Sequence, residues 1–174
     1  KYKRGAKMPK TLIIYYSQSG NTKDMAEKIA EGLKKEAVQV EIKEVTQTKP
    51  EDLLSADGII VGSPTYYGSM AFQIKELFDR SVKFHGKLDG KIGAAFTSSA
   101  NVGGGNETTI LDILNAMLIH GMVIQGDPQG DHYGPVSIGK PDQRARKQCI
   151  RCGKRIVELS KKHKIYIFSR TCNL

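Results

Sequence analysis

Apolar and polar residues follow two periods along this chain, and the periods alternate from one segment to the next. Short apolar, β-branched runs predict buried strands, whereas apolar residues spaced three and four apart predict helices with one buried face. Strands are expected at Lys10–Tyr16, Val38–Val45, Asp57–Ser63, Lys91–Ser98 and Met122–Gln125. Helices are expected at Thr22–Lys35, Met70–Phe84, Asn106–His120 and from Pro141 to about Lys162.

Five strands separated by helices predict an α/β fold: a three-layer, doubly wound, five-stranded parallel sheet with right-handed crossovers. The 174 residues suit one domain, expected at residues 10–164, between a basic extension at 1–9 and a tail at 165–174. In such sheets ligands bind at the carboxyl ends of the strands, where the winding direction switches. The loops after the first, third and fourth strands are therefore the expected site.

The composition is that of a globular protein, with 39% hydrophobic and 26% charged residues. No apolar run approaches the roughly 18–20 residues that a membrane span requires, and no signal-peptide core follows the basic start. Three cysteines are too few for a disulfide framework. We therefore expect a cytoplasmic protein with free thiols.

The net charge of +9 is concentrated at the two ends of the chain. Residues 1–10 carry +5 and residues 140–174 carry +9, whereas the segment between them carries −5. Basic ends can bind nucleic acid, anionic lipid or acidic proteins. They also suit a solvated helix face and a frayed tail, and we favour this interpretation, so nucleic acid is not an expected partner.

The loop after the first strand consists of six small polar residues before an amphipathic helix. A helix N-terminus offers unpaired N–H groups and a partial positive charge, which suit a phosphate without lysine or arginine. Helix capping explains one such residue but not six. The loop lacks the Gly-Lys pair of a P-loop and the GxGxxG of a dinucleotide site. The predicted phosphate ligands are Ser17, Gln18, Ser19, Gly20, Asn21 and Thr22.

The loop after the third strand holds two adjacent tyrosines between a proline and a glycine. Aromatic side chains at this position can form a wall for a planar ring. A surface turn over the core is the alternative. The candidate ligands here are Pro64, Thr65, Tyr66, Tyr67 and Gly68.

The loop after the fourth strand contains three consecutive glycines. Such a run costs chain entropy, and it makes sense where the backbone must pass close to a flat ligand. A flexible surface loop is the alternative. The candidate ligands here are Ser98, Ser99, Asn101, Val102, Gly103 and Gly104.

These loops resemble those of flavin mononucleotide (FMN) proteins of the flavodoxin fold. The stretch Ile14–Ala26 (IYYSQSGNTKDMA) is similar to the flavodoxin phosphate-loop signature. Residues 63–70, 98–109 and 119–124 resemble segments of NAD(P)H:quinone oxidoreductases of the tryptophan-repressor-binding-protein type. The resemblance covers about residues 10–160. It departs at Tyr66, where that group has arginine, and at residues 126–139, which replace a longer excursion.

The resemblance implies strand order 2-1-3-4-5, tightly bound FMN, and NAD(P)H as a hydride donor to the flavin. A quinone or similar acceptor would then take two electrons. It also implies a homo-oligomer, either a dimer or a tetramer. The first alternative is a flavodoxin-type electron carrier between redox proteins, although flavodoxins are generally strongly acidic. The second is a flavin-loaded binding protein whose basic last helix docks on an acidic partner or nucleic acid.

Two histidines and a tyrosine are further candidates. His120 ends the helix before the fifth strand, so it could act on a flavin only from a neighbouring subunit, as its family counterpart implies; stabilisation of the helix terminus is the alternative. His132 and Tyr133 follow the fifth strand. We expect Tyr133 to cover the flavin edge and His132 to reach a quinone oxygen, with a polar turn as the alternative.

The remaining motif is Cys149-x-x-Cys152. A thioredoxin-like pair lies at the start of a helix after a strand, whereas this pair lies within the last predicted helix. Both cysteines fall on its apolar stripe, so core thiols are expected. No second ligand pair completes a zinc site, and no metal is predicted.

Overall fold

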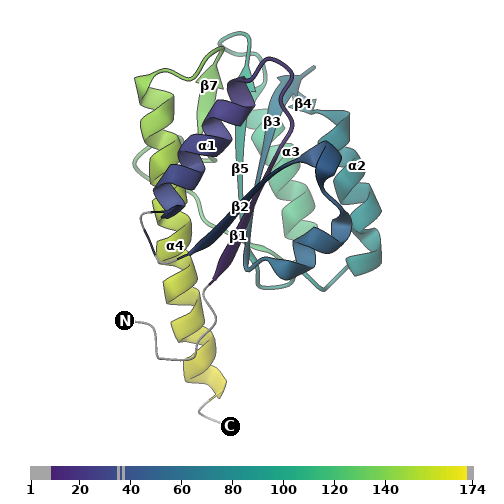
Figure 1. The fold of residues 1–174 in the computed structure, drawn as a ribbon, viewed down its shortest axis with the longest axis vertical. Coiled ribbons are helices and arrows are strands. Elements are labelled where there is room, and N and C mark those ends of the chain that lie inside the picture. Colours follow the sequence, from purple (N-terminus) through teal and green to yellow (C-terminus); the bar gives the residue numbers. More distant parts are fainter. Residues whose placement is uncertain (1–8, 35, 37, 172–174) are drawn as a thin grey trace.

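A parallel sheet with helices on both faces forms the fold (Figure 1). The computed structural model describes residues 9–34, 36 and 38–171, with side chains as far as residue 162. The sheet order is β2-β1-β3-β5-β6, and its neighbours are parallel, which confirms the predicted topology. These strands are β1 (Lys10–Tyr15), β2 (Gln39–Glu44), β3 (Gly58–Tyr66), β5 (Ile92–Ser99) and β6 (Val123–Ile124).

The helices form the two outer layers. α1 (Asn21–Lys34) and α4 (Gln143–Thr171) cover one face, while α2 (Phe72–Arg80) and α3 (Asn106–Ile119) cover the other (Figure 1). Short 3-10 turns lie at Val45–Gln47, Pro50–Ser55 and Ser81–Phe84. The predicted domain boundary at residue 164 falls within α4, and residues 1–8 of the predicted extension lie outside the described chain. No described helix is long and apolar enough to span a bilayer.

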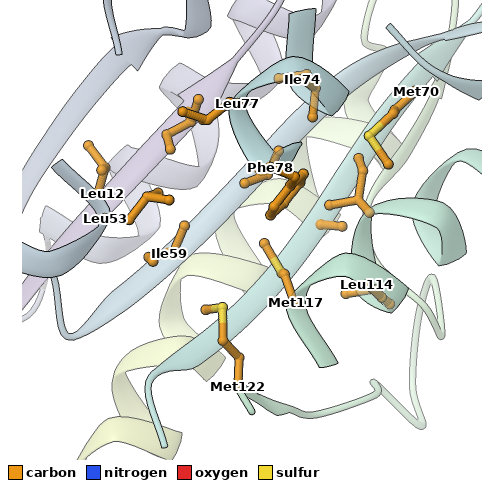
Figure 2. Packing of buried hydrophobic residues seen from close by; sticks show 14 of the residues in the cluster. Leu12, Leu53, Ile59, Met70, Ile74, Leu77, Phe78, Leu114, Met117 and Met122 are labelled. Atoms are coloured by element: carbon orange, nitrogen blue, oxygen red, sulfur yellow. The ribbon is translucent and has the colours of Figure 1, made fainter. Parts of the chain in front are cut away.

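The sheet is buried on both faces, which explains the unbroken apolar runs of its central strands. Because side chains alternate along a strand, Leu12 and Ile59 point to the layer of α2 and α3, where they belong to the same core as Phe78 and Met117 (Figure 2). The adjacent Ile13 faces α1 and α4 instead. The second core is completed by Met25, Ile29, Ile60, Phe96, Cys149 and Val157.

The edge strand beside β5 is interrupted, which corrects the sequence prediction. β6 pairs with Ile92 and Gly93, and β7 (Val136–Ile138) resumes the pairing beside Thr97–Ser99. Residues 125–135, here called the excursion, leave the sheet between the two pieces. The predicted strand at Met122–Gln125 therefore corresponds only to β6, the first of the two pieces of the edge strand.

Arginines of α4 hold the excursion against the body of the protein. Arg151 makes two hydrogen bonds to the Asp127 carboxylate, at 2.5 and 2.8 Å, and Arg155 lies 3.5 Å from it. Arg144 contacts the Asp131 carboxylate at 2.7 Å. The hydrogen bonds from Arg151 are the main reason that the Asp127 pKa falls from 3.8 to about 2. Much of the basic character of α4 thus serves contacts within the chain.

Candidate functional site

Three loops meet at one edge of the sheet because β1, β3 and β5 are adjacent and parallel. The first loop is Ser17–Thr22, the second Pro64–Gly68 and the third Ser98–Gly105. Hydroxyl groups join them below the surface. The Thr22 and Ser98 hydroxyls are 2.9 Å apart and buried, which links the first loop to the third. Thr65 lies 3.1 Å from the hydroxyl of Thr109, in the first turns of α3.

The first loop presents unpaired backbone donors at the start of α1. The amides of Lys23 and Asp24 bond to the Ser17 hydroxyl and the Gly20 carbonyl. By contrast, the four amides of Ser19–Thr22 have no acceptor among the described residues. Four consecutive free N–H groups at a helix N-terminus fit a phosphate group without any cation in the loop.

A salt bridge from α4 reduces the negative charge near these amides. Asp24 lies in the first turn of α1, where its carboxylate favours the helix but repels an anion. Arg146 of α4 contacts this carboxylate at 2.9 Å. The charge at this end of α1 is therefore balanced by a residue far away in the sequence.

The second loop is a tight hairpin rather than a simple loop. Pro64–Tyr66 continue β3, which pairs with β4 (Ser69–Met70). Tyr67 and Gly68 at the turn both have positive φ angles, 51° and 76°. This two-residue turn matches the twist of a hairpin, although Tyr67 adopts the conformation at a steric cost. The Tyr67 side chain is consequently held fully exposed at the tip of the hairpin.

Tyr66 points from the hairpin toward the first loop. Its hydroxyl donates a hydrogen bond of 2.9 Å to Gln18 Oε1. Its ring meets Tyr16 edge to face, with centroids 6.4 Å apart. The two adjacent tyrosines therefore differ: one reaches another loop, and the other extends into solvent.

The third loop packs closely against the hairpin at Gly105. This residue has a φ of +100°, and an added Cβ would lie 2.6 Å from the Gly68 Cα. Thr108 reinforces the contact by donating from its hydroxyl to the Gly68 carbonyl at 2.6 Å. Val102, near the middle of the third loop, is exposed. A glycine is required at position 105 because any side chain would push the second and third loops apart.

Comparison with known proteins agrees with this geometry. A family model described as a flavodoxin domain matches residues 12–109, more than half of the chain. The chain belongs to the flavodoxin family. The protein named "Flavodoxin" of Aquifex aeolicus is 41% identical, over 87% of this chain and 86% of that one. The protein named "NAD(P)H dehydrogenase (quinone)" of Archaeoglobus fulgidus is 32% identical, over 89% of this chain and 99% of its own.

A solved structure also supports membership of the flavodoxin family. The flavodoxin, WrbA-like protein from Agrobacterium tumefaciens superposes with a TM-score of 0.75 at 27% identity. The match covers 89% of this chain and 99% of that one. The likeness therefore extends beyond the three loops to nearly the whole domain.

His132 and Tyr133 do not join the three loops of this flavodoxin-family site. The sequence placed them after the fifth strand, but they lie in the excursion, before β7 completes that strand. His132 Nδ1 donates to the Asp127 carbonyl at 2.7 Å, and Tyr133 is half exposed. In the described part of the chain, no hydrogen bond connects either residue to the three loops. Their position between β6 and β7 follows from the unpredicted strand β7.

His120 lies at the opposite edge of the sheet, as its position at the end of α3 indicated. It is buried, and its Nε2 lies 2.8 Å from the Ser81 hydroxyl. That hydroxyl donates to the Phe78 carbonyl, so Nε2–H donates to it in turn. Burial is the main cause of a lowered His120 pKa, with a smaller contribution from His85. These contacts describe a neutral histidine that closes the end of α3.

The two cysteines within the described residues are free thiols on α4. Cys149 is fully buried and belongs to the core between α1, α4 and the sheet, whereas Cys152 is partly buried beside it. Burial raises the pKa of both thiols. Cys172 lies outside the described residues. The described pair thus packs as small apolar side chains.

The sequence missed residues that reach the site from other elements. Thr109 bonds to Thr65, and Arg146 balances Asp24 across 122 positions of the chain. Lys140 follows β7 at the same edge as the three loops, next to Gly139, whose amide bonds to the Ser99 carbonyl at 2.7 Å. No local pattern marks these residues, since each depends on a tertiary contact.

Proposed function

We propose that this protein is an FMN-dependent oxidoreductase that passes electrons from NAD(P)H to a quinone or similar acceptor. The observation that carries the proposal is the row of four free amides at Ser19–Thr22, beside an aromatic hairpin at the same sheet edge. These donors fit a phosphate monoester, and the neighbouring loops suit a planar ring. Relatives named NAD(P)H dehydrogenase (quinone) support the same activity.

The residues of the three loops would position the cofactor. The first loop would bind the phosphate end through its amides and the hydroxyl of Ser19. The second loop flanks the ring system through Thr65, Tyr66 and Tyr67. The third loop brings Asn101–Gly104 against it. Bound FMN would supply the ring that takes up a hydride and delivers electrons to an acceptor, and the protein would supply its placement and orientation.

Anaerobic mixing of the FMN-loaded protein with NADH or NADPH tests the proposal. We expect rapid loss of the flavin absorbance, followed by reoxidation when a benzoquinone is added, and steady turnover when both are present. A protein that binds FMN but is not reduced by either nucleotide would overturn the proposed reaction. A protein that does not bind FMN would overturn the cofactor assignment as well.

An electron carrier is the second candidate, and the 41% identical relative named "Flavodoxin" favours it. Stepwise reduction separates the two functions. A carrier accumulates a semiquinone and is not bleached by NAD(P)H, whereas the reductase passes directly to the two-electron reduced form. A binding protein that uses its basic last helix receives less support, because Arg144, Arg151 and Arg155 of α4 are engaged by the excursion.

A dimer or tetramer and a cytoplasmic location belong to the same proposal. Three apolar side chains on the layer of α2 and α3 support assembly, since Phe72, Leu118 and Ile119 are largely exposed. Large apolar side chains that are exposed favour burial against another copy.

A further inference from the structure

The three loops are joined to one another by unequal contacts. The first and third loops share the buried Thr22–Ser98 pair. The second loop is linked to the third-loop side by Thr65 and by the carbonyl of Gly68, which accepts from Thr108. Among the described residues, a single exposed hydrogen bond joins the first loop to the second, from Tyr66 to Gln18.

The tip of the first loop has few other anchors. Gly20 has a φ of +88°, and no atom would lie within 4 Å of a Cβ added to it. Ser17 contributes one long contact of 3.3 Å from the Lys23 amide. The free amides of Ser19–Thr22 therefore depend on the loop conformation, and the contact at Gln18 is well placed to hold it.

Tyr66 is well suited to hold Gln18. Its ring packs edge to face on Tyr16, which restricts the direction in which the hydroxyl can point. Burial raises the Tyr66 pKa, so the hydroxyl remains a neutral donor throughout the physiological range. The family resemblance places arginine at this position, so the tyrosine hydroxyl that donates to Gln18 is a departure from that pattern.

We infer that Tyr66 and Gln18 form a latch that holds the phosphate-binding tip of the first loop and slows release of the cofactor through its phosphate end. The inference rests on the proposed function, because it takes FMN as the ligand. Tyr66 acts here as a positioning residue. Its hydroxyl orders the loop whose amides bind the phosphate, and the hydroxyl itself need not touch the ligand.

Release of FMN from Tyr66→Phe, Gln18→Leu and the double variant tests the latch. The rise in flavin fluorescence after rapid dilution gives the release rate. We expect each single variant to release FMN about two- to tenfold faster than the wild type, as the net strength of one hydrogen bond indicates. The double variant should be no faster than the faster single variant, because both changes remove one contact. Tyr16→Phe keeps the ring contact with Tyr66 and is the matched control, with release at the wild-type rate.

Riboflavin distinguishes the latch from a general effect on the ring. It has the same ring system as FMN but no phosphate, so its affinity should be equal in the wild type and in Tyr66→Phe. An equal loss of affinity for FMN and riboflavin would overturn the latch, as would FMN release at the wild-type rate. Far-UV circular dichroism verifies that the variants are folded.

Amide hydrogen exchange of the cofactor-free protein gives a readout that does not need FMN. Exchange of the Lys23 and Asp24 amides, which bond to the Ser17 hydroxyl and the Gly20 carbonyl, should be faster in Tyr66→Phe than in the wild type, while exchange in the buried strands β1 and β3 stays the same. Unchanged exchange of the Lys23 and Asp24 amides would overturn the latch. If the wild type failed to bind FMN but its amides still exchanged more slowly than those of Tyr66→Phe, the proposed function would fail and the contact that holds the loop would stand.

Discussion

Replacing Asp127 by asparagine tests how strongly the excursion is held to α4. The substitution keeps the shape of the side chain and removes the charge that faces Arg151 and Arg155. Both guanidinium groups would then face each other without a neutralising carboxylate. We expect Asp127→Asn to lower the free energy of unfolding at neutral pH.

The magnitude follows from the shift in the Asp127 pKa, which falls from 3.8 to about 2. A shift of this size corresponds to at most about 2.4 kcal/mol of differential stabilisation. Asp127 is 14% exposed and Arg151 is 34% exposed, so solvent screening reduces the effect. The expected loss is about 1–2 kcal/mol.

The pH dependence has a definite sign. Because the folded-state pKa is lower than the unfolded value, the carboxylate contributes its full stability above about pH 4 and loses it as the pH falls toward 2. The gap between wild type and Asp127→Asn should be constant from pH 6 to 8 and shrink to about half by pH 3. Urea unfolding of the cofactor-free proteins at several pH values measures this gap.

An exposed aspartate provides the matched control for this experiment. Asp79 pairs with Lys75 at 2.6 Å on the surface of α2, and both side chains are mostly exposed. Asp79→Asn should leave the unfolding free energy nearly unchanged. Equal stability of the wild type and Asp127→Asn at pH 7, or a gap that stays constant down to pH 3, would refute the reasoning.

Two further substitutions address the opposite ends of the sheet. His120→Asn removes a buried base with a lowered pKa. The unfolding free energy of the wild type should therefore fall relative to that of this variant as the pH drops below 6.5. An equal difference in unfolding free energy at pH 8 and pH 5 would contradict this. Gly105→Ala should cost roughly 1–2 kcal/mol for its left-handed conformation and about 1–3 kcal/mol more because the new Cβ meets Gly68, and it should weaken FMN binding. Gly103→Ala, with open space around it, should cost only the roughly 1–2 kcal/mol of its left-handed conformation, as thermal unfolding of the cofactor-free protein would show.

The central strands could be predicted because they are buried on both faces. Leu12 and Ile13 point into different cores, so the run around them is apolar without interruption. β7 gave no comparable signal: its three residues stand between Gly134-Pro135 and Gly139, a composition typical of a loop. The hairpin at Tyr67 was also missed, since a non-glycine residue with positive φ has no clear sequence signature.

The site could be predicted where its chemistry is local and not where it depends on tertiary contacts. Six consecutive small polar residues before a helix mark the first loop by themselves. The contact between Gln18 and Tyr66 joins positions 48 apart, and no periodicity connects them. The position of His132 before β7 was not predicted for a related reason, because it depends on where the edge strand resumes.

Because the edge strand is interrupted, the register of β7 does not depend on the length of the excursion. β7 returns to the sheet beside Thr97–Ser99, so its own pairing sets the register at the carboxyl edge, whatever the chain length between Ile124 and Val136. Doubling the length of a flexible loop costs only about 0.6 kcal/mol of closure entropy. Residues added to the excursion away from Asp127 and Asp131, which bond to α4, should therefore leave the spacing of the three loops unchanged.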